Sequence, residues 1–138
     1  MPTSADQQAI PGFALAVTAE SLYLLNLLLL PGLGFVLLLL LYLTRFKQSP
    51  VLAKAHLSQT LMASLWGGFL LLVINALILL LGGYSGVYTW VIVILYFTVV
   101  HASFVLLGAL GLARALSGQC WRYPVVGPQL PEGCEHSQ

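Results

Sequence analysis

The sequence predicts an all-α integral membrane protein with three transmembrane helices and its C-terminus inside the cell. Of its 138 residues, 59% are hydrophobic and only 7% are charged. Soluble domains carry about 25% charged residues, so this chain lacks the charges needed to cover a water-facing surface. Its few Lys and Arg residues lie in two short stretches beside the long apolar runs. The length predicts one compact unit.

Three segments are expected along the chain: an N-terminal leader over residues 1–19, a transmembrane domain over residues 20–117 and an irregular cytoplasmic tail over residues 118–138. The leader has no Lys or Arg. A cleaved secretory signal begins with positive charge, so we expect the leader to be retained. Pro124, Pro128 and Pro131 predict irregular structure in the tail.

The first span, residues 22–44, is interrupted at its centre by Pro31 and Gly32. Proline removes a backbone donor and clashes with the preceding helical turn. From Pro31 to Arg45 the chain would reach roughly 21 Å as a helix, which is short of the ~30 Å hydrocarbon core of a bilayer. We therefore expect one span that is kinked or broken at Pro31–Gly32, with a helical hairpin as the alternative.

The second and third spans are predicted at residues 57–81 and 87–116. Pro50 suits the first position of the second helix, and Gly82 with Gly83 is a helix-ending signal. A long apolar run in lipid must be helical, because an isolated strand would leave its backbone groups without partners.

The distribution of basic residues predicts the orientation. Arg45, Lys47 and Lys54 precede the second span, and Arg114 and Arg122 follow the main part of the third. Lys and Arg concentrate in cytoplasmic loops, so both stretches are expected inside, together with the C-terminus. The N-terminus would be outside with three spans, and inside if Pro31 marks a hairpin.

Small and polar residues within the apolar runs are candidates for helix contacts. Small side chains let helices approach closely in lipid. The predicted packing residues are Thr60, Ser64, Gly67, Gly68, Gly108, Gly111 and Ala115. Among the polar residues, Asn26 and Asn75 are expected to bond to each other or to nearby backbone. His101 is expected to bond to Ser64 across the helix interface.

The sequence offers little for catalysis. The four acidic residues all lie outside the predicted apolar core, and Glu20, the nearest to it, is expected at the outer rim. No nucleophile has a base at recognisable spacing. A haem held by His56 and His101 is disfavoured, because the two histidines lie at different depths. A zinc site at Cys120, Cys134 and His136 lacks a fourth ligand. We therefore expect no enzyme, cofactor or metal site.

Cys120 and Cys134 are expected to be reduced thiols, with a disulfide as the alternative. The formal net charge of +1, without a basic face, gives no basis for binding nucleic acid.

Three short motifs resemble the Tic20-like, DUF4870-type small membrane proteins. The first is the Pro-Gly break at residues 30–34, the second is His56 in the opening of a helix, and the third is Arg122-Tyr123-Pro124 near the end. The resemblance covers about residues 20–128. It implies a role like that of components of a plastid protein-import complex and no catalytic residues. The chain departs from the pattern at Leu57 and Trp121.

The expected function is that of a non-enzymatic accessory or assembly subunit in a bacterial inner membrane, packed against a larger protein complex. Its predicted inner-face contact residues are Lys54, His56, Arg122 and Tyr123. The alternative is a pore or carrier protomer in a homo-oligomer, with Asn26, Asn75 and His101 lining a path. In either case the lipid bilayer is an expected partner.

Overall fold

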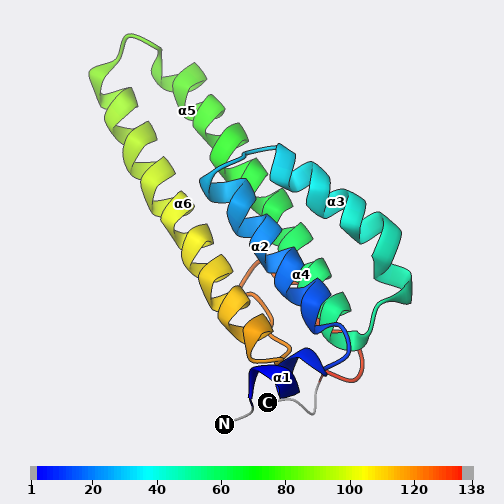
Figure 1. The fold of residues 1–138 in the computed structure, drawn as a ribbon. Helices are drawn as coiled ribbons and strands as arrows, with labels where there is room; N and C mark the ends of the chain where they lie inside the picture. The colour runs from blue at the N-terminus through cyan, green and yellow to red at the C-terminus, as the bar shows by residue number, and fades with distance from the viewer. Residues whose placement is uncertain (1–2, 135–138) are drawn as a thin grey trace.

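The computed structural model describes residues 3–134, and every regular element in that range is helical. Two long antiparallel helices form its frame (Figure 1). The first consists of α4 (Val51–Gly68), a π-helical segment η2 (Phe69–Ile74) and α5 (Asn75–Gly82). The second is α6 (Val87–Leu116). These helices contain 32 and 30 residues, about 48 and 45 Å, so both are long and apolar enough to cross a bilayer.

The predicted first span is instead a helical hairpin, and its interpretation as one kinked crossing is wrong. Helix α2 (Phe13–Leu28) packs against α3 (Leu33–Arg45), and the chain reverses between them (Figure 1). With 16 and 13 residues, they are about 24 and 20 Å long. Each is shorter than the hydrocarbon core. The described residues therefore contain two candidate spans rather than three.

Asn26 explains how the chain can reverse among apolar residues. Its side-chain oxygen accepts hydrogen bonds from the backbone N–H groups of Gly32, at 2.9 Å, and Phe35, at 3.0 Å. These donors at the start of α3 would otherwise be costly in lipid. Gly34 lies so close that an added Cβ would be 2.7 Å from the Cα of Asn26. Pro31 and Gly32 break the helix, and Asn26 and Gly34 close the hairpin.

The predicted leader is also partly helical. A short helix, α1 (Ser4–Gln8), is capped by Thr3. Helix α2 already begins at Phe13, inside the segment predicted as leader. At the other end of the hairpin, a 3-10 turn, η1 (Phe46–Gln48), leads from α3 into α4. The last predicted segment begins as an irregular tail after α6, and its His136, considered above as a zinc ligand, lies outside the described residues.

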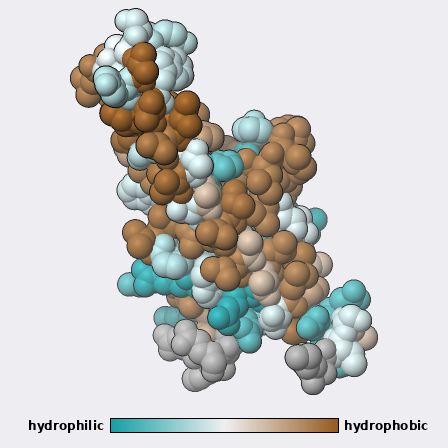
Figure 2. All heavy atoms as spheres, turned by 90° about the vertical axis from the view of Figure 1, so that its left-hand side faces the viewer, coloured by the Kyte–Doolittle hydropathy of each residue, from teal (hydrophilic) through white to brown (hydrophobic). Residues whose placement is uncertain are grey.

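The core lies around α2, which contacts α3, α4 and α6. Its buried hydrophobic residues are Ala19, Tyr23, Leu38, Leu57, Ala63, Phe104 and Tyr123. Beyond the tip of the hairpin, α5 and the first half of α6 pack against each other and against η2, and Leu80, Leu81 and Val87 are highly exposed. Figure 2 shows hydrophobic residues over most of one face, with hydrophilic residues mainly toward the lower end. This is the surface expected of a protein in lipid.

The hairpin places α1, η1 and the tail at one end of the molecule, and the link between α5 and α6 at the other (Figure 1). All five basic residues belong to the first end. We call it the basic end. The bias of Lys and Arg toward the cytoplasm predicts that the basic end is inside.

Candidate functional site

Three fully buried side chains from separate parts of the chain meet at the basic end. Glu20 comes from α2, His56 from the second turn of α4 and Tyr123 from the tail, and each is 0% exposed. The Nδ1 atom of His56 lies 2.6 Å from one carboxyl oxygen of Glu20. The hydroxyl of Tyr123 donates to the other oxygen. We call these three residues the Glu20 cluster.

The contact made by the second ring nitrogen of His56 determines the charge of this cluster. Its Nε2 lies 3.0 Å from the backbone carbonyl of Gln119, which can only accept, so Nε2 carries a proton. The contact with Glu20 then holds one further proton, either on Nδ1 or on the carboxyl group. Both arrangements give the pair a net charge of zero, which suits a site with no access to water.

The surroundings of the Glu20 cluster are tightly packed and apolar. Burial raises the pKa of the Glu20 carboxyl. The hydrogen bond from His56, the charge of His56 and the hydrogen bond from Tyr123 oppose that rise. Burial, together with the neighbouring Glu20 charge, also raises the pKa of Tyr123 far above its ordinary value. Tyr23 packs edge-to-face on Tyr123, with ring centres 5.8 Å apart. A Cβ added at Gly111 would lie 2.5 Å from both the Glu20 carboxyl and the Tyr123 hydroxyl.

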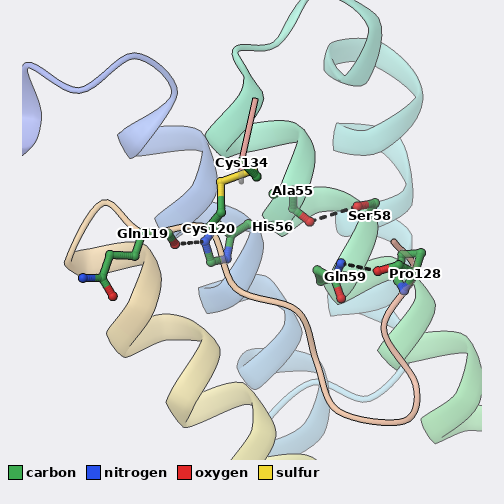
Figure 3. Close-up of a disulfide and its surroundings, with 8 residues drawn as sticks. All are labelled: Ala55, His56, Ser58, Gln59, Gln119, Cys120, Pro128 and Cys134. Carbon is green, nitrogen blue, oxygen red and sulfur yellow. Dashed lines mark hydrogen bonds between the residues drawn. A yellow bond between two sulfur atoms is a disulfide. The ribbon is translucent and has the colours of Figure 1, made fainter. Parts of the chain in front are cut away.

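Gln59, one turn beyond His56, binds the tail to α4. Its side-chain nitrogen donates to the Pro128 carbonyl at 2.9 Å, and its oxygen accepts from the Tyr123 backbone N–H at 3.1 Å. Within the tail, Arg122 donates to the Gly127 carbonyl. Figure 3 shows the tail running past these α4 residues. Although the tail forms no helix up to residue 134, side chains of α4 hold it in place.

A disulfide between Cys120 and Cys134 closes the tail beside α4 (Figure 3). The expectation of two reduced thiols is therefore wrong in this structure. Residues separated by 14 positions form a loop whose closure can stabilise the folded state by about 3 kcal/mol. At one end of the bridge, Cys120 follows Gln119, whose carbonyl contacts His56. At the other end, Cys134 is the last residue of the described tail.

The structure distributes the predicted packing residues over several interfaces. Gly108 and Gly111 face α2, where Tyr23, Leu24 and Glu20 approach closely, and Ala115 packs with Ala16. On α4, Thr60 and Ser64 are buried and Gly67 faces Phe104 of α6. Gly68 has no neighbour within 4 Å of an added Cβ. Helix α2 thus covers much of the α6 small-residue face.

The predicted buried polar residues do not meet one another. Asn26 caps α3, while the side-chain nitrogen of Asn75 donates to the Leu71 carbonyl at 2.6 Å. His101 stacks on Phe97, with ring centres 5.3 Å apart. It makes no bond to Ser64, whose hydroxyl has no hydrogen-bond partner in the structure. The expected His101–Ser64 contact is therefore wrong.

Of the predicted inner-face contact residues, His56 and Tyr123 are fully buried, Lys54 is partly exposed and Arg122 is exposed. The sequence interpretation missed Glu20 because it placed that residue at the opposite side of the membrane. The available signal was an acidic residue just before the first long apolar run and a histidine near the start of the second. If the hairpin alternative is adopted, both residues lie at the same end.

The chemistry of the Glu20 cluster is that of a structural clamp. It joins α2, α4 and the tail through hydrogen bonds and one shared proton. Among residues 3–134, no group of three His, Cys, Asp or Glu side chains is placed to hold a metal ion. The contacts of the cluster hold α2, α4 and the tail together.

These features define a small helical membrane protein whose hairpin and tail are joined by a buried polar clamp. The chain belongs to the magnetosome magnetite crystal formation protein family (MamF/MmsF), whose model matches residues 14–130. This match corrects the resemblance to Tic20-like, DUF4870-type proteins. The matched range contains all but the first residue of the hairpin, both long helices and the whole Glu20 cluster. Searches of curated proteins and of solved structures found no match.

Proposed function

We propose that this protein is a non-enzymatic accessory component of a membrane in which magnetite crystals form. The family match over residues 14–130 carries the proposal. Two long apolar helices support an integral position in that membrane. The membrane would be a bacterial inner membrane or a compartment derived from it.

In this proposal the protein packs against a larger membrane protein complex. The apolar surface of α5 and of the first half of α6, which α2 and α3 leave uncovered, supports a role in packing within the bilayer. At the basic end, Lys54 and Arg122 have accessible side chains, whereas His56 and Tyr123 act from inside the fold. The pore alternative has less support, because Asn26, Asn75 and His101 each interact with separate neighbouring groups in the chain.

Gene replacement in a magnetite-forming bacterium tests this role. Deleting the gene should change the size or number of magnetite crystals seen by electron microscopy. The wild-type gene and a Glu20→Gln variant should restore them, because Gln can keep the hydrogen bonds of the Glu20 cluster. Glu20→Ala should fail to do so through loss of folded protein, measured as its amount in the membrane fraction. Unchanged crystals after deletion would refute the proposed role.

A further inference from the structure

A shallow apolar groove lies on the outer face of α4 and the start of η2. Met62, Leu65, Trp66 and Phe69 line it, and these side chains are between 36% and 50% exposed. Trp66 and Phe69 meet edge-to-face, with ring centres 6.1 Å apart. Because these residues belong to a candidate span, the groove faces the hydrocarbon region of the bilayer.

The same helix face continues toward the basic end with polar residues. From Phe69 through Leu65 and Met62, steps of three or four residues lead to Ser58 and Lys54. Residues at this spacing lie along one side of a helix. Lys54 is thus about 16 Å below Leu65 along the helix axis. The α4 face therefore has a cation at its membrane edge and an apolar groove deeper in the bilayer.

Within residues 3–134, no acidic side chain neutralises the cation on this face. Across residues 3–134, the single ion pair within 4.0 Å joins His56 and Glu20, so Lys54 has none. Nearby, the end of α3 adds Arg45 and η1 adds Lys47, both exposed and also without an ion pair in that range. Positive charge near the surface of an anionic membrane attracts lipid headgroups.

We propose that the α4 face binds an anionic phospholipid, with its phosphate at Lys54 and an acyl chain in the groove from Met62 to Phe69. The positive charge is complementary to the headgroup, and the change from polar to apolar along the helix axis matches the polarity of a lipid molecule. A second copy of the chain would cover the apolar groove without accounting for the unpaired lysine. This site is independent of any role in crystal formation.

Fluorescence quenching tests the site, because Trp66 lines the groove. The full chain with Trp90→Phe and Trp121→Phe keeps Trp66 as its sole tryptophan. It would be placed in phosphatidylcholine vesicles containing a fixed fraction of acyl-brominated phosphatidylglycerol or acyl-brominated phosphatidylcholine. One lysine near an anionic surface provides a preference of about fivefold. Brominated phosphatidylglycerol should therefore quench Trp66 more strongly than the same fraction of brominated phosphatidylcholine. The difference should correspond to about fivefold enrichment of the anionic lipid at the groove.

Two charge variants separate this site from general attraction to the basic end. Lys54→Gln should remove the difference between the two brominated lipids. Arg114→Gln removes a cation from α6 at the same end and should leave the difference in place. Equal quenching by both lipids in the Lys54 protein would refute the proposal. Absence of quenching by either lipid would also refute it, because a protein surface would then cover Trp66.

Discussion

Replacing Glu20 by alanine is expected to lower the free energy of unfolding by about 3–5 kcal/mol, the usual cost of removing one partner of a buried ion pair. The substitution leaves Nδ1 of His56 and the hydroxyl of Tyr123 without their partner in a fully buried site. It also removes the contact that joins α2 to both α4 and the tail. Denaturant-induced unfolding of the detergent-solubilised protein, followed by circular dichroism, measures the effect.

Glu20→Gln is the matched control. Its amide nitrogen can donate to Nδ1 of a neutral His56, while its amide oxygen accepts from Tyr123. The cluster would keep its net charge of zero, so the loss of stability should be much smaller than with alanine. In the double variant Glu20→Ala/His56→Ala, the total loss should be smaller than the sum of the two single losses. Equal losses for the alanine and glutamine variants would contradict this account, because the hydrogen bonds to His56 and Tyr123 that glutamine keeps would then contribute nothing to stability.

Replacing Gly111 by alanine should also destabilise the protein strongly. The new Cβ would lie 2.5 Å from both the Glu20 carboxyl and the Tyr123 hydroxyl, so α6 would have to move away from the cluster. Overpacking of this kind costs about 1–3 kcal/mol, and displaced hydrogen bonds would increase the loss. The same unfolding measurement applies.

Gly68→Ala is the control for helix propensity. Gly68 ends α4, where the helical backbone continues into η2, and it has open space around an added Cβ. Alanine in such a position should therefore be neutral or stabilise the helix by up to about 1 kcal/mol. A similar response at positions 68 and 111 would contradict the close packing of α6 against the Glu20 cluster.

The helical class and the two long apolar helices could be predicted from the sequence, because lipid leaves an apolar segment few alternatives to a helix. Whether the chain kinks or reverses at Pro31 could not be predicted. A Pro-Gly pair is compatible with a kink or a reversal, and helix length alone favoured the wrong one. Tertiary contacts select the reversal: Asn26 caps α3, and Gly34 allows α3 to approach α2.

Prediction of the Glu20 cluster depended on the same choice between a kink and a reversal at Pro31. His56 was identified from its position at the start of a helix, but its partner Glu20 was assigned to the other side of the membrane. Tyr123 was identified only as a surface contact, because nothing in the local sequence indicates that the tail folds back onto α4. Gln59 and the disulfide hold it there through contacts that are distant in the sequence.

The disulfide and the charge bias give opposite indications about orientation. Lys and Arg place the basic end in the cytoplasm, whereas disulfides are rare in that reducing compartment. A thiol reagent acting on Cys120 and Cys134 would not distinguish the two orientations, because bridged cysteines do not react on either side. Cysteines introduced at other positions are needed.

Labelling of introduced cysteines tests the hairpin most directly. In a Cys120→Ser/Cys134→Ser background, single variants Gln8→Cys, Ser85→Cys and Gln129→Cys place a thiol on α1, in the α5–α6 link and in the tail, all at exposed positions. A membrane-impermeant maleimide is applied to spheroplasts before and after permeabilisation. We predict that positions 8 and 129 react only after permeabilisation and that position 85 reacts before it. Reaction of positions 8 and 85 together in intact spheroplasts would mean that residues 13–45 cross the membrane once, which contradicts the hairpin.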